Sequence, residues 1–290
     1  MTCRERHVVG LVGAGIGPSL TPALHEREGA AHGMDYSYRR FDITRLGVAP
    51  GDVGAIVAQA RREGFSGLNV THPCKQLVIP HLDALSPDAD ALHAVNTVVF
   101  EGGRSIGHNT DRSGFSAGFR RGLPTVPRDH VVQLGAGGAG IAVAHALLDL
   151  GVGALTVLDV DPDRAAAAAE ALGPDRAAAA DLARLPELLD TADGLVHATP
   201  VGMAVHPGLP LPADLLNPRL WVAEVVYRPL ETALLREARR RGCRTLDGGA
   251  MAVFQAAHAF TLFTGREPDT DRMLTHFAEL VGTVPAERIA

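Results

Sequence analysis

The sequence is poor in cysteine and has no surplus of positive charge. Its 290 residues include three cysteines, Cys3, Cys74 and Cys243, which are widely separated and odd in number. This pattern argues against a disulfide framework and against a structural zinc site, which needs paired cysteines. The formal net charge of −6 provides none of the basic excess that gives affinity for nucleic acid. We therefore expect neither a disulfide scaffold nor a nucleic-acid partner.

Long apolar runs and metal-binding motifs are also missing. No run approaches the roughly 20 apolar residues of a membrane span, and the first residues, MTCRERH, lack the apolar core of a secretory signal. We expect a soluble, cytoplasmic protein with no membrane partner. None of the 13 histidines forms HExxH or a comparable pair. We therefore expect no metal site, and we interpret His72, His81, His93 and His197 as ordinary loop or core residues.

Short apolar segments alternate with helical patterns along the chain, which predicts an α/β fold with parallel sheets covered by helices. A chain of 290 residues exceeds the size at which one core usually keeps growing, so two domains are the default. The expected elements are strands at 8–12, 36–41, 67–70, 97–100, 105–108, 195–199, 221–226 and 244–246, with helices at 22–33, 52–63, 249–264 and 269–281. Residues 97–108 read as a hairpin. The alanine run 165–169 fits a helix, and the run 177–180 fits a helix or a short buried strand.

A glycine-rich segment follows the apolar run 131–134. It reads Gly135-Ala136-Gly137-Gly138-Ala139-Gly140 and precedes a helical pattern. In a strand-turn-helix unit, such glycines allow a tight turn, close approach of a pyrophosphate, and close packing of the helix on the strand. The free N–H groups at the helix start then hold the phosphates. The segment therefore predicts a dinucleotide site.

An acidic residue at the end of the next strand decides which dinucleotide we expect. Asp159 ends the apolar run 154–158, about 20 residues after the glycines, where an acid binds the free ribose hydroxyl. A 2′-phosphate here would face Asp159 and Asp161 with no compensating cation except Arg164 further along. We therefore expect NAD rather than NADP.

Three polar clusters lie where expected strands end, which is where ligands bind in open α/β sheets. Each also has an interpretation without chemistry. Ser19 and Thr21 could cap a helix, Asn69 and Asn109 could be turn residues, Lys75 could be a solvated charge, and Asp111 could cap a helix beginning near Arg112.

Taken together, the motifs resemble the shikimate dehydrogenase family over nearly the whole chain. The resemblance is carried by Ser19-x-Thr21-Pro22, Asn69-Val70-Thr71-x-Pro73-x-Lys75, Ala94-Val95-Asn96-Thr97, Gly107-x-Asn109-Thr110-Asp111, Gly135-Ala136-Gly137-Gly138, Ala198-Thr199-Pro200-x-Gly202-Met203 and Gln255-Ala256. More narrowly, the chain resembles the NAD-dependent quinate/shikimate dehydrogenase branch, in which a threonine, here Thr21, stands where typical shikimate dehydrogenases have a second serine. NADP enzymes of the family usually carry an Asn-Arg-Thr-like stretch where this chain has Asp159-Val160-Asp161. Two positions depart from the family pattern, Gly140 for a frequent serine and Ala250 for a glycine.

The resemblance implies roles for individual residues. Lys75 and Asp111 would form the catalytic pair, with Lys75 exchanging a proton with the hydroxyl that is oxidised and Asp111 orienting it and the substrate. The substrate ligands implied are Ser19, Thr21, Thr71, Asn96, Tyr227 and Gln255. The implied cofactor contacts are Gly135, Ala136, Gly137, Gly138, Ala139, Asp159, Arg164, Thr199, Pro200, Gly202, Met203, Val226, Gly248 and Met251.

The resemblance also implies an architecture and an activity. Residues 1–112, completed by 248–290, would form an N-terminal α/β substrate domain, and 113–247 a Rossmann-type NAD-binding domain, with the C-terminal helices returning to the substrate domain. The implied function is NAD-linked interconversion of quinate with 3-dehydroquinate and of shikimate with 3-dehydroshikimate, by a monomer or homodimer. A biosynthetic shikimate dehydrogenase, an enzyme for the amino analogues, and a non-catalytic NAD or shikimate sensor remain alternatives. Retention of both Lys75 and Asp111 argues against the sensor.

Overall fold

The computed structural model describes residues 5–282, and its backbone contacts divide the chain into two compact units. Unit 1 comprises the residues up to Thr110 and those from Val253 onward, and unit 2 comprises Asp111–Ala252. Unit 1 is therefore discontinuous in sequence. The breaks expected from the sequence lay after residues 112 and 247; in the structure they fall after 110 and 252.

Unit 1 is built on a mixed sheet. Its strands, within the described residues, are β1 (Arg6–Gly13), β2 (Asp35–Asp42), β3 (Gly67–Val70), β4 (Ala84–Leu85), β5 (Thr97–Glu101) and β6 (Arg104–His108). They lie in the order β2-β1-β3-β5-β6-β4. β1 pairs in parallel with β2 and β3, whereas β5 is antiparallel to β3 and β6. The predicted hairpin is thus confirmed.

Helices cover both faces of the unit 1 sheet. They are α1 (Thr21–Ala31), α2 (Ile43–Leu46), α3 (Val53–Arg62), α4 (Cys74–Leu77), α5 (Pro87–Leu92), α12 (Thr270–Leu280) and the part of α11 (Gly248–Thr264) from Val253 onward. Successive β1 side chains point to opposite faces: Val8 packs with Ile56 of α3, and Val9 with Ala259 and Phe263 of α11. The C-terminal segment therefore returns to complete the first unit, as predicted.

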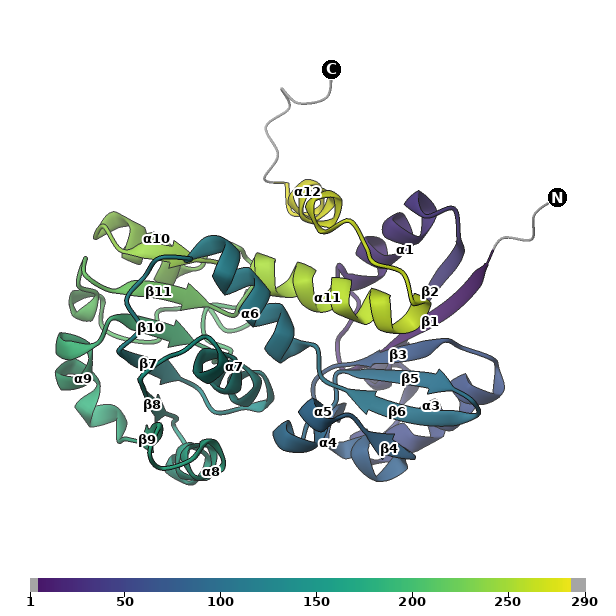
Figure 1. Ribbon diagram of the computed structural model, residues 1–290, viewed down its shortest axis with the longest axis horizontal. Coiled ribbons are helices and arrows are strands. Elements are labelled where there is room, and N and C mark those ends of the chain that lie inside the picture. Colours follow the sequence, from purple (N-terminus) through teal and green to yellow (C-terminus); the bar gives the residue numbers. More distant parts are fainter. Residues whose placement is uncertain (1–4, 283–290) are drawn as a thin grey trace, which may run out of the picture. The chain divides into compact units, whose positions relative to one another are not determined.

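Unit 2 is built on a parallel sheet. Its strands, in the part of the chain that the structure describes, are β7 (His130–Leu134), β8 (Ala154–Leu158), β9 (Ala177–Ala179), β10 (Gly194–His197), β11 (Trp221–Glu224) and β12 (Arg244–Leu246). They lie in the order β12-β11-β10-β7-β8-β9 (Figure 1), and each neighbouring pair is parallel. This is the Rossmann order, in which the winding reverses beside the first strand, here between β7 and β10.

Two helical layers bury the alternating side chains of this sheet. The helices of unit 2 are α6 (Asp111–Gly122), α7 (Gly138–Asp149), α8 (Pro162–Leu172), α9 (Leu185–Thr191) and α10 (Ala233–Arg240). Val131 of β7 faces a cluster that includes Phe119 of α6 and Leu147 of α7. Its neighbour Val132 faces Leu189 of α9 and Leu235 of α10. The α/β prediction for both halves is confirmed.

The second alanine run forms a short strand, one of the two predicted alternatives, but it lies at the edge of the sheet rather than buried within it. Only Ala177 of β9 is buried, while Ala178 and Ala179 are exposed. The eight-residue helix α10 was not predicted. The shorter elements α2, α4, α5, α9 and β4 were not predicted either. They contain two to seven residues, too few for a periodic apolar pattern to show.

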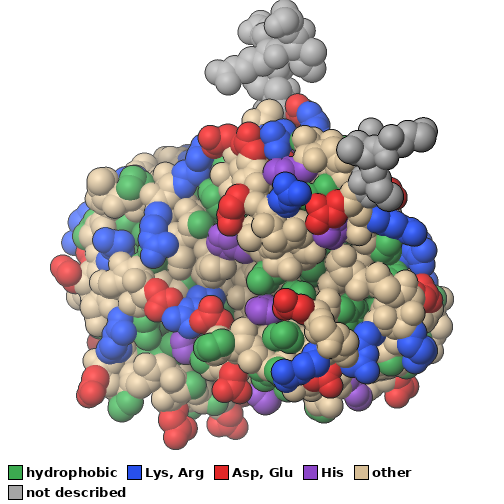
Figure 2. Space-filling model, turned by 45° about the vertical axis from the view of Figure 1, so that its right-hand side comes forward, with side chains coloured by type: hydrophobic (Ala, Val, Ile, Leu, Met, Phe, Trp, Pro, Cys, Tyr) green, Lys and Arg blue, Asp and Glu red, His purple; other side chains and the backbone are tan. Residues whose placement is uncertain are grey.

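The surface carries mixed charge, and Figure 2 shows acidic and basic side chains interspersed over one face. Within residues 5–282, no helix combines the length and the apolar character that crossing a membrane requires. In the same residues, no group of three or more His, Cys, Asp or Glu side chains is placed to hold a metal ion.

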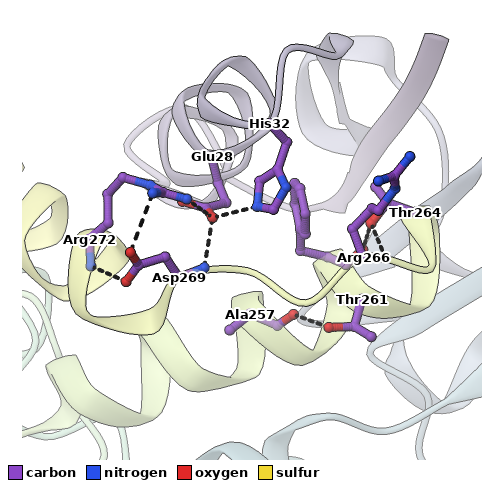
Figure 3. A network of polar contacts seen from close by, with 9 residues as sticks. Glu28, His32, Ala257, Thr261, Thr264, Arg266, Asp269 and Arg272 are labelled. Carbon is purple, nitrogen blue, oxygen red and sulfur yellow. Dashed lines mark hydrogen bonds and ion pairs between the residues drawn. The ribbon is translucent and has the colours of Figure 1, made fainter. Parts of the chain in front are cut away.

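A buried carboxylate joins α12 to α1 inside unit 1 (Figure 3). The side chain of Glu28 is 1% exposed, and it accepts hydrogen bonds from Arg272 Nε at 2.9 Å, Arg272 Nη2 at 2.6 Å and the Asp269 N–H at 2.8 Å. Burial alone would raise the pKa of Glu28, but these hydrogen bonds and the Arg272 charge hold it below its ordinary value. The pair therefore stabilises the folded state above the ordinary glutamate pKa.

Replacing Arg272 with alanine is expected to lower the free energy of unfolding by about 2–3 kcal/mol at pH 7. The change leaves the Glu28 charge buried, and Arg272 is itself partly exposed, which places the loss at or below the range for fully buried pairs. Because the pKa of Glu28 is lowered on folding, the difference from wild type should shrink as the pH falls through that pKa.

The matched control is Arg27→Ala, since Arg27 on α1 pairs with Glu279 on α12 but both side chains are more than a third exposed. Urea unfolding of the three proteins measures the difference. Equal losses in the two variants would contradict the assigned role of Glu28.

Candidate functional site

The glycine loop follows β7, beside the point where the sheet reverses. Gly135 has φ +102°, and a Cβ there would lie 2.6 Å from the Ala198 carbonyl oxygen. A Cβ on Gly140 would collide with the Gly135 carbonyl, whereas Gly137 has open space on that side. The glycines thus keep the turn tight and leave the Gly137 backbone accessible.

Helix α7 begins at this loop with its N–H groups available. Its N-cap is Gly137, and no side chain caps it among the described residues. Gly138 and Ala139 are the first helical residues. The N-terminus of a helix carries partial positive charge and unpaired N–H groups, which suits a pyrophosphate.

A buried glutamine supports the glycine loop, and its role was not predicted from the sequence. Gln133 is fully buried, and its Nε2 donates to the carbonyl oxygens of Gly135 and Gly140, each at 2.8 Å. The signal was a polar residue inside an apolar run directly before the glycines.

Asp159 follows β8 and ties the loop to the next strand. Its side chain is 7% exposed; Oδ2 accepts the Ala136 N–H at 2.7 Å and Oδ1 accepts the Asp161 N–H at 2.9 Å. Val160 beside it is 85% exposed. Arg164 lies 3.9 Å from Asp159 Oδ1 and donates from Nε to Asp161 Oδ2 at 3.0 Å. The arginine is thus held between two carboxylates.

The predicted contacts after β10, β11 and β12 also approach the glycine loop or one another. A Cβ on Gly135 would lie 3.0 Å from Thr199 Cγ2, so Thr199 packs on the first glycine. A Cβ on Gly248 would lie 2.7 Å from the Val226 carbonyl oxygen, which makes glycine necessary there. Met251 is 8% exposed and packs in the hydrophobic core of unit 2. The remaining predicted contacts, Pro200, Gly202 and Met203, lie in the turn after Thr199.

In unit 1, the structure contradicts the capping interpretation of Ser19 and Thr21. The N-cap of α1 is Leu20, and no side chain caps the helix among the described residues. Ser19 Oγ accepts the Thr21 N–H at a long 3.4 Å, and both side chains are half-buried.

Backbone hydrogen bonds bring Thr71, Lys75 and Asn96 to one region of unit 1. Thr71 follows β3 and its N–H donates to the Val12 carbonyl at 2.9 Å. Lys75 lies half-buried on α4, and its carbonyl accepts the Val95 N–H at 2.9 Å. The Asn96 carbonyl accepts the Val70 N–H at 2.7 Å.

Asn96 holds the loop that precedes Asp111. Its Nδ2 donates to Thr110 Oγ1 at 3.0 Å, and its Oδ1 accepts the Thr110 N–H at 2.8 Å. Asp111 then begins α6, 6% exposed and assigned to unit 2. The residue proposed as a substrate ligand thus has a structural task as well.

Asn69 is not a turn residue as the alternative interpretation held. It lies buried inside β3, where Oδ1 accepts from the Tyr38 hydroxyl at 2.5 Å and Nδ2 donates to Thr97 Oγ1 at 3.0 Å. Asn109 does lie in a loop, and its Nδ2 donates to the Ala94 carbonyl at 2.9 Å.

Two further predicted ligands are half-buried. Gln255 lies on α11 in unit 1, and Tyr227 follows β11 in unit 2. Burial raises the pKa of the Tyr227 hydroxyl, with a smaller opposing effect from Arg228, so the hydroxyl stays protonated and able to donate.

Lys75 is also distinguished in the sequence by its residue type. The chain has 27 lysines and arginines, of which Lys75 is the single lysine. Arginine serves as the cation everywhere else. A lysine differs from arginine in having a titratable amine, so this position is distinguished by chemistry rather than by charge.

Comparison with known proteins assigns the chain to a family. Residues 11–98 match the family model "Shikimate dehydrogenase substrate binding domain", and residues 250–275 match "Shikimate 5'-dehydrogenase C-terminal domain". A shikimate dehydrogenase (NADP(+)) from Streptomyces avermitilis is 66% identical over 97% of this chain and 98% of its own length. A quinate/shikimate dehydrogenase (NAD(+)) from Corynebacterium efficiens is 48% identical over 94% of this chain and 98% of its own length.

Among solved structures, quinate dehydrogenase from Corynebacterium glutamicum in complex with NAD aligns with a TM-score of 0.90. It is 45% identical, and the alignment covers 95% of this chain and 100% of that one. The glycine loop at the sheet reversal, the family models and the full-length relatives agree, and the chain belongs to the shikimate dehydrogenase family of nicotinamide-dependent oxidoreductases.

Proposed function

We propose that the protein is an NAD-dependent oxidoreductase that interconverts quinate with 3-dehydroquinate and shikimate with 3-dehydroshikimate. The observation that supports NAD is the charge around Asp159. A 2′-phosphate carries nearly two negative charges and would meet the carboxylates of Asp159 and Asp161, while Val160 offers no donor. Arg164, the nearby cation, already pairs with both carboxylates.

The opposing observation is the name of the Streptomyces relative, which specifies NADP(+). A biosynthetic, NADP-dependent shikimate dehydrogenase is therefore the alternative. The Corynebacterium relatives, named for quinate/shikimate and NAD(+), favour the proposal, as does Thr21 at the position that resembles their branch.

We assign the proton transfer to Lys75. The nicotinamide, when bound, exchanges hydride with the ring carbon that carries the reacting hydroxyl. In alcohol oxidation, the neutral amine of Lys75 accepts the hydroxyl proton; in ketone reduction, its ammonium form returns a proton to the carbonyl oxygen. Asp111 would orient the amine and the substrate. The choice of lysine in a chain that otherwise uses arginine supports this role, because a guanidinium does not release its proton in proteins.

Neutral polar groups would recognise the substrate. Hydroxyl and amide groups each pair with one substrate hydroxyl or carboxylate oxygen, and a site built this way rejects analogues that lack one of those groups. We assign this to Ser19, Thr21, Thr71, Asn96, Gln255 and Tyr227. Ser19 and Thr21 suit the role because neither side chain is used to cap α1.

The cofactor proposal predicts a strong NAD preference. With quinate and with shikimate, kcat/KM for NAD should exceed that for NADP by roughly 100-fold, equivalent to about 2.7 kcal/mol. Initial rates of NADH and NADPH formation across the four combinations measure it.

Two variants sharpen the measurement. Asp159→Asn combined with Val160→Arg keeps an acceptor for the Ala136 N–H, removes one charge and adds a phosphate partner, so it should shift the preference towards NADP. Val160→Ala is the control and should leave the ratio of kcat/KM for NAD to kcat/KM for NADP unchanged. Equal efficiency of wild type with NADP would contradict the NAD assignment, turnover of shikimate with NADP alone would favour the alternative, and no turnover in any combination would contradict the proposed function.

The proton-transfer assignment predicts that another positive charge at position 75 cannot replace the function of Lys75. Lys75→Arg and Lys75→Met should both lower kcat by roughly 10²–10⁴-fold, the usual contribution of general acid-base catalysis. Arg62→Met, which removes an exposed cation from α3, should leave kcat unchanged. Cofactor binding, followed by NADH fluorescence, should be the same in all variants. A Lys75→Arg enzyme with near-wild-type turnover would show that Lys75 does not carry the proton.

A further inference from the structure

Two buried ionisable residues face each other at the carboxyl ends of β10 and β11. His197 and Glu224 are the last residues of these parallel strands and are paired in register. His197 Nδ1 lies 2.8 Å from Glu224 Oε1, and both side chains are 0% exposed. Neither residue is among those that the sequence motifs assign to the site.

The hydrogen bonds of Glu224 reach two further segments. Oε1 also accepts the Val226 N–H at 3.0 Å, and Oε2 accepts from Thr232 Oγ1 at 3.1 Å. Thr232 in turn caps α10 by accepting the Leu235 N–H at 3.2 Å. The carboxylate therefore fixes the chain that leaves β11 and the helix that follows it.

The hydrogen bonds of His197 reach the loop after β10. The other ring nitrogen, Nε2, lies 2.5 Å from Thr199 Oγ1. The Thr199 hydroxyl is hydrogen-bonded to the ring and accepts the Val201 N–H at 3.2 Å. Each polar atom of the imidazole and the carboxylate thus has a partner, and the Thr199 hydroxyl is directed inward.

The segments held in this way lie on one side of the sheet reversal. The glycine loop and Asp159 follow β7 and β8 and suit the pyrophosphate and the adenosine ribose. The other half of a dinucleotide that crosses the reversal then lies over the ends of β10 and β11, where Thr199 and Val226 are. The methyl group of Thr199 also packs on Gly135, which joins this loop to the glycine loop.

A requirement for stability alone does not explain an ionisable pair here. Buried charged or polar pairs are often no more stabilising than well-packed apolar side chains of similar volume. The pair instead fixes the orientation of the segments that follow β10 and β11, because each hydrogen bond sets the position of one of them.

We propose that His197 and Glu224 are positioning residues for the nicotinamide half of the cofactor. His197 acts through the Thr199 hydroxyl on the loop 199–203, and Glu224 acts through the Val226 N–H on the segment that leads to Tyr227. This inference rests on the proposed function, in which the protein uses a nicotinamide cofactor.

The first test is a pair of substitutions at Thr199. Thr199→Val removes the hydroxyl but keeps the shape, so the loop loses its link to His197; Thr199→Ser keeps the hydroxyl. Thr199→Val should weaken NADH binding, measured as the fluorescence Kd, by about 10-fold, the loss that one hydrogen bond of about 1.4 kcal/mol produces, and should lower kcat with it. Thr199→Ser should stay within about 3-fold of wild type on the same scale. The KM of the ring acid should stay unchanged in both.

A second pair of variants separates positioning from stability. His197→Asn keeps a donor that faces Glu224 but cannot reach Thr199, so it should reproduce the Thr199→Val defect. The control is Thr156→Val, which removes a similar contact between a hydroxyl and a histidine. Thr156 Oγ1 lies 3.0 Å from Nε2 of His130, and His130 is at the amino end of β7, away from the cofactor edge. This control should lower the thermal midpoint without changing the NADH Kd.

The outcomes are distinguishable. If Thr199→Val and His197→Asn lose thermal stability like Thr156→Val but keep the wild-type Kd and kcat, the pair is structural only and the inference is wrong. If wild type binds NADH but oxidises neither acid, the proposed function fails, while the Kd comparison still decides the positioning role.

Discussion

In a parallel sheet, every strand ends at the same edge, and the side chains and N–H groups just beyond that edge are the ones left free for a ligand. Unit 2 depends on this constraint. Parallel pairing of β7 with β8 and β10, and of β10 with β11, places the glycine loop, Asp159, Thr199 and Val226 at one edge. The strand order reverses between β7 and β10, the position at which open α/β sheets bind dinucleotides.

The carboxylates at this edge already accept hydrogen bonds from the protein backbone. Asp159 holds the glycine loop through the Ala136 N–H, and Glu224 holds the Val226 N–H. Each carboxylate therefore shapes the backbone at this edge of the sheet, where we propose that the cofactor binds. In unit 1, the amide of Asn96 does the same for the loop before Asp111. Preorganised loops of this kind hold reacting groups in place without reorganisation during the reaction.

Much of the fold could be predicted from the chain because its local signals agree. The apolar runs, the Gly102-Gly103 hairpin and the glycine loop appeared as elements of the predicted type. Short elements such as α4 and β4 could not be predicted, since a few residues carry no period. The capping interpretation of Ser19 failed for a related reason: a residue type favours a cap, but the backbone decides which residue occupies that position, here Leu20.

The sequence by itself determined the family resemblance, the dinucleotide loop and the candidate residues, because these are properties of residue order. The sequence alone also shows that Lys75 is the single lysine of the chain. Only the tertiary structure decided that His197 meets Glu224 and that Thr199 turns its hydroxyl inward. Such contacts follow from strand order and register, which bring together residues that are distant in the chain and that no local pattern connects.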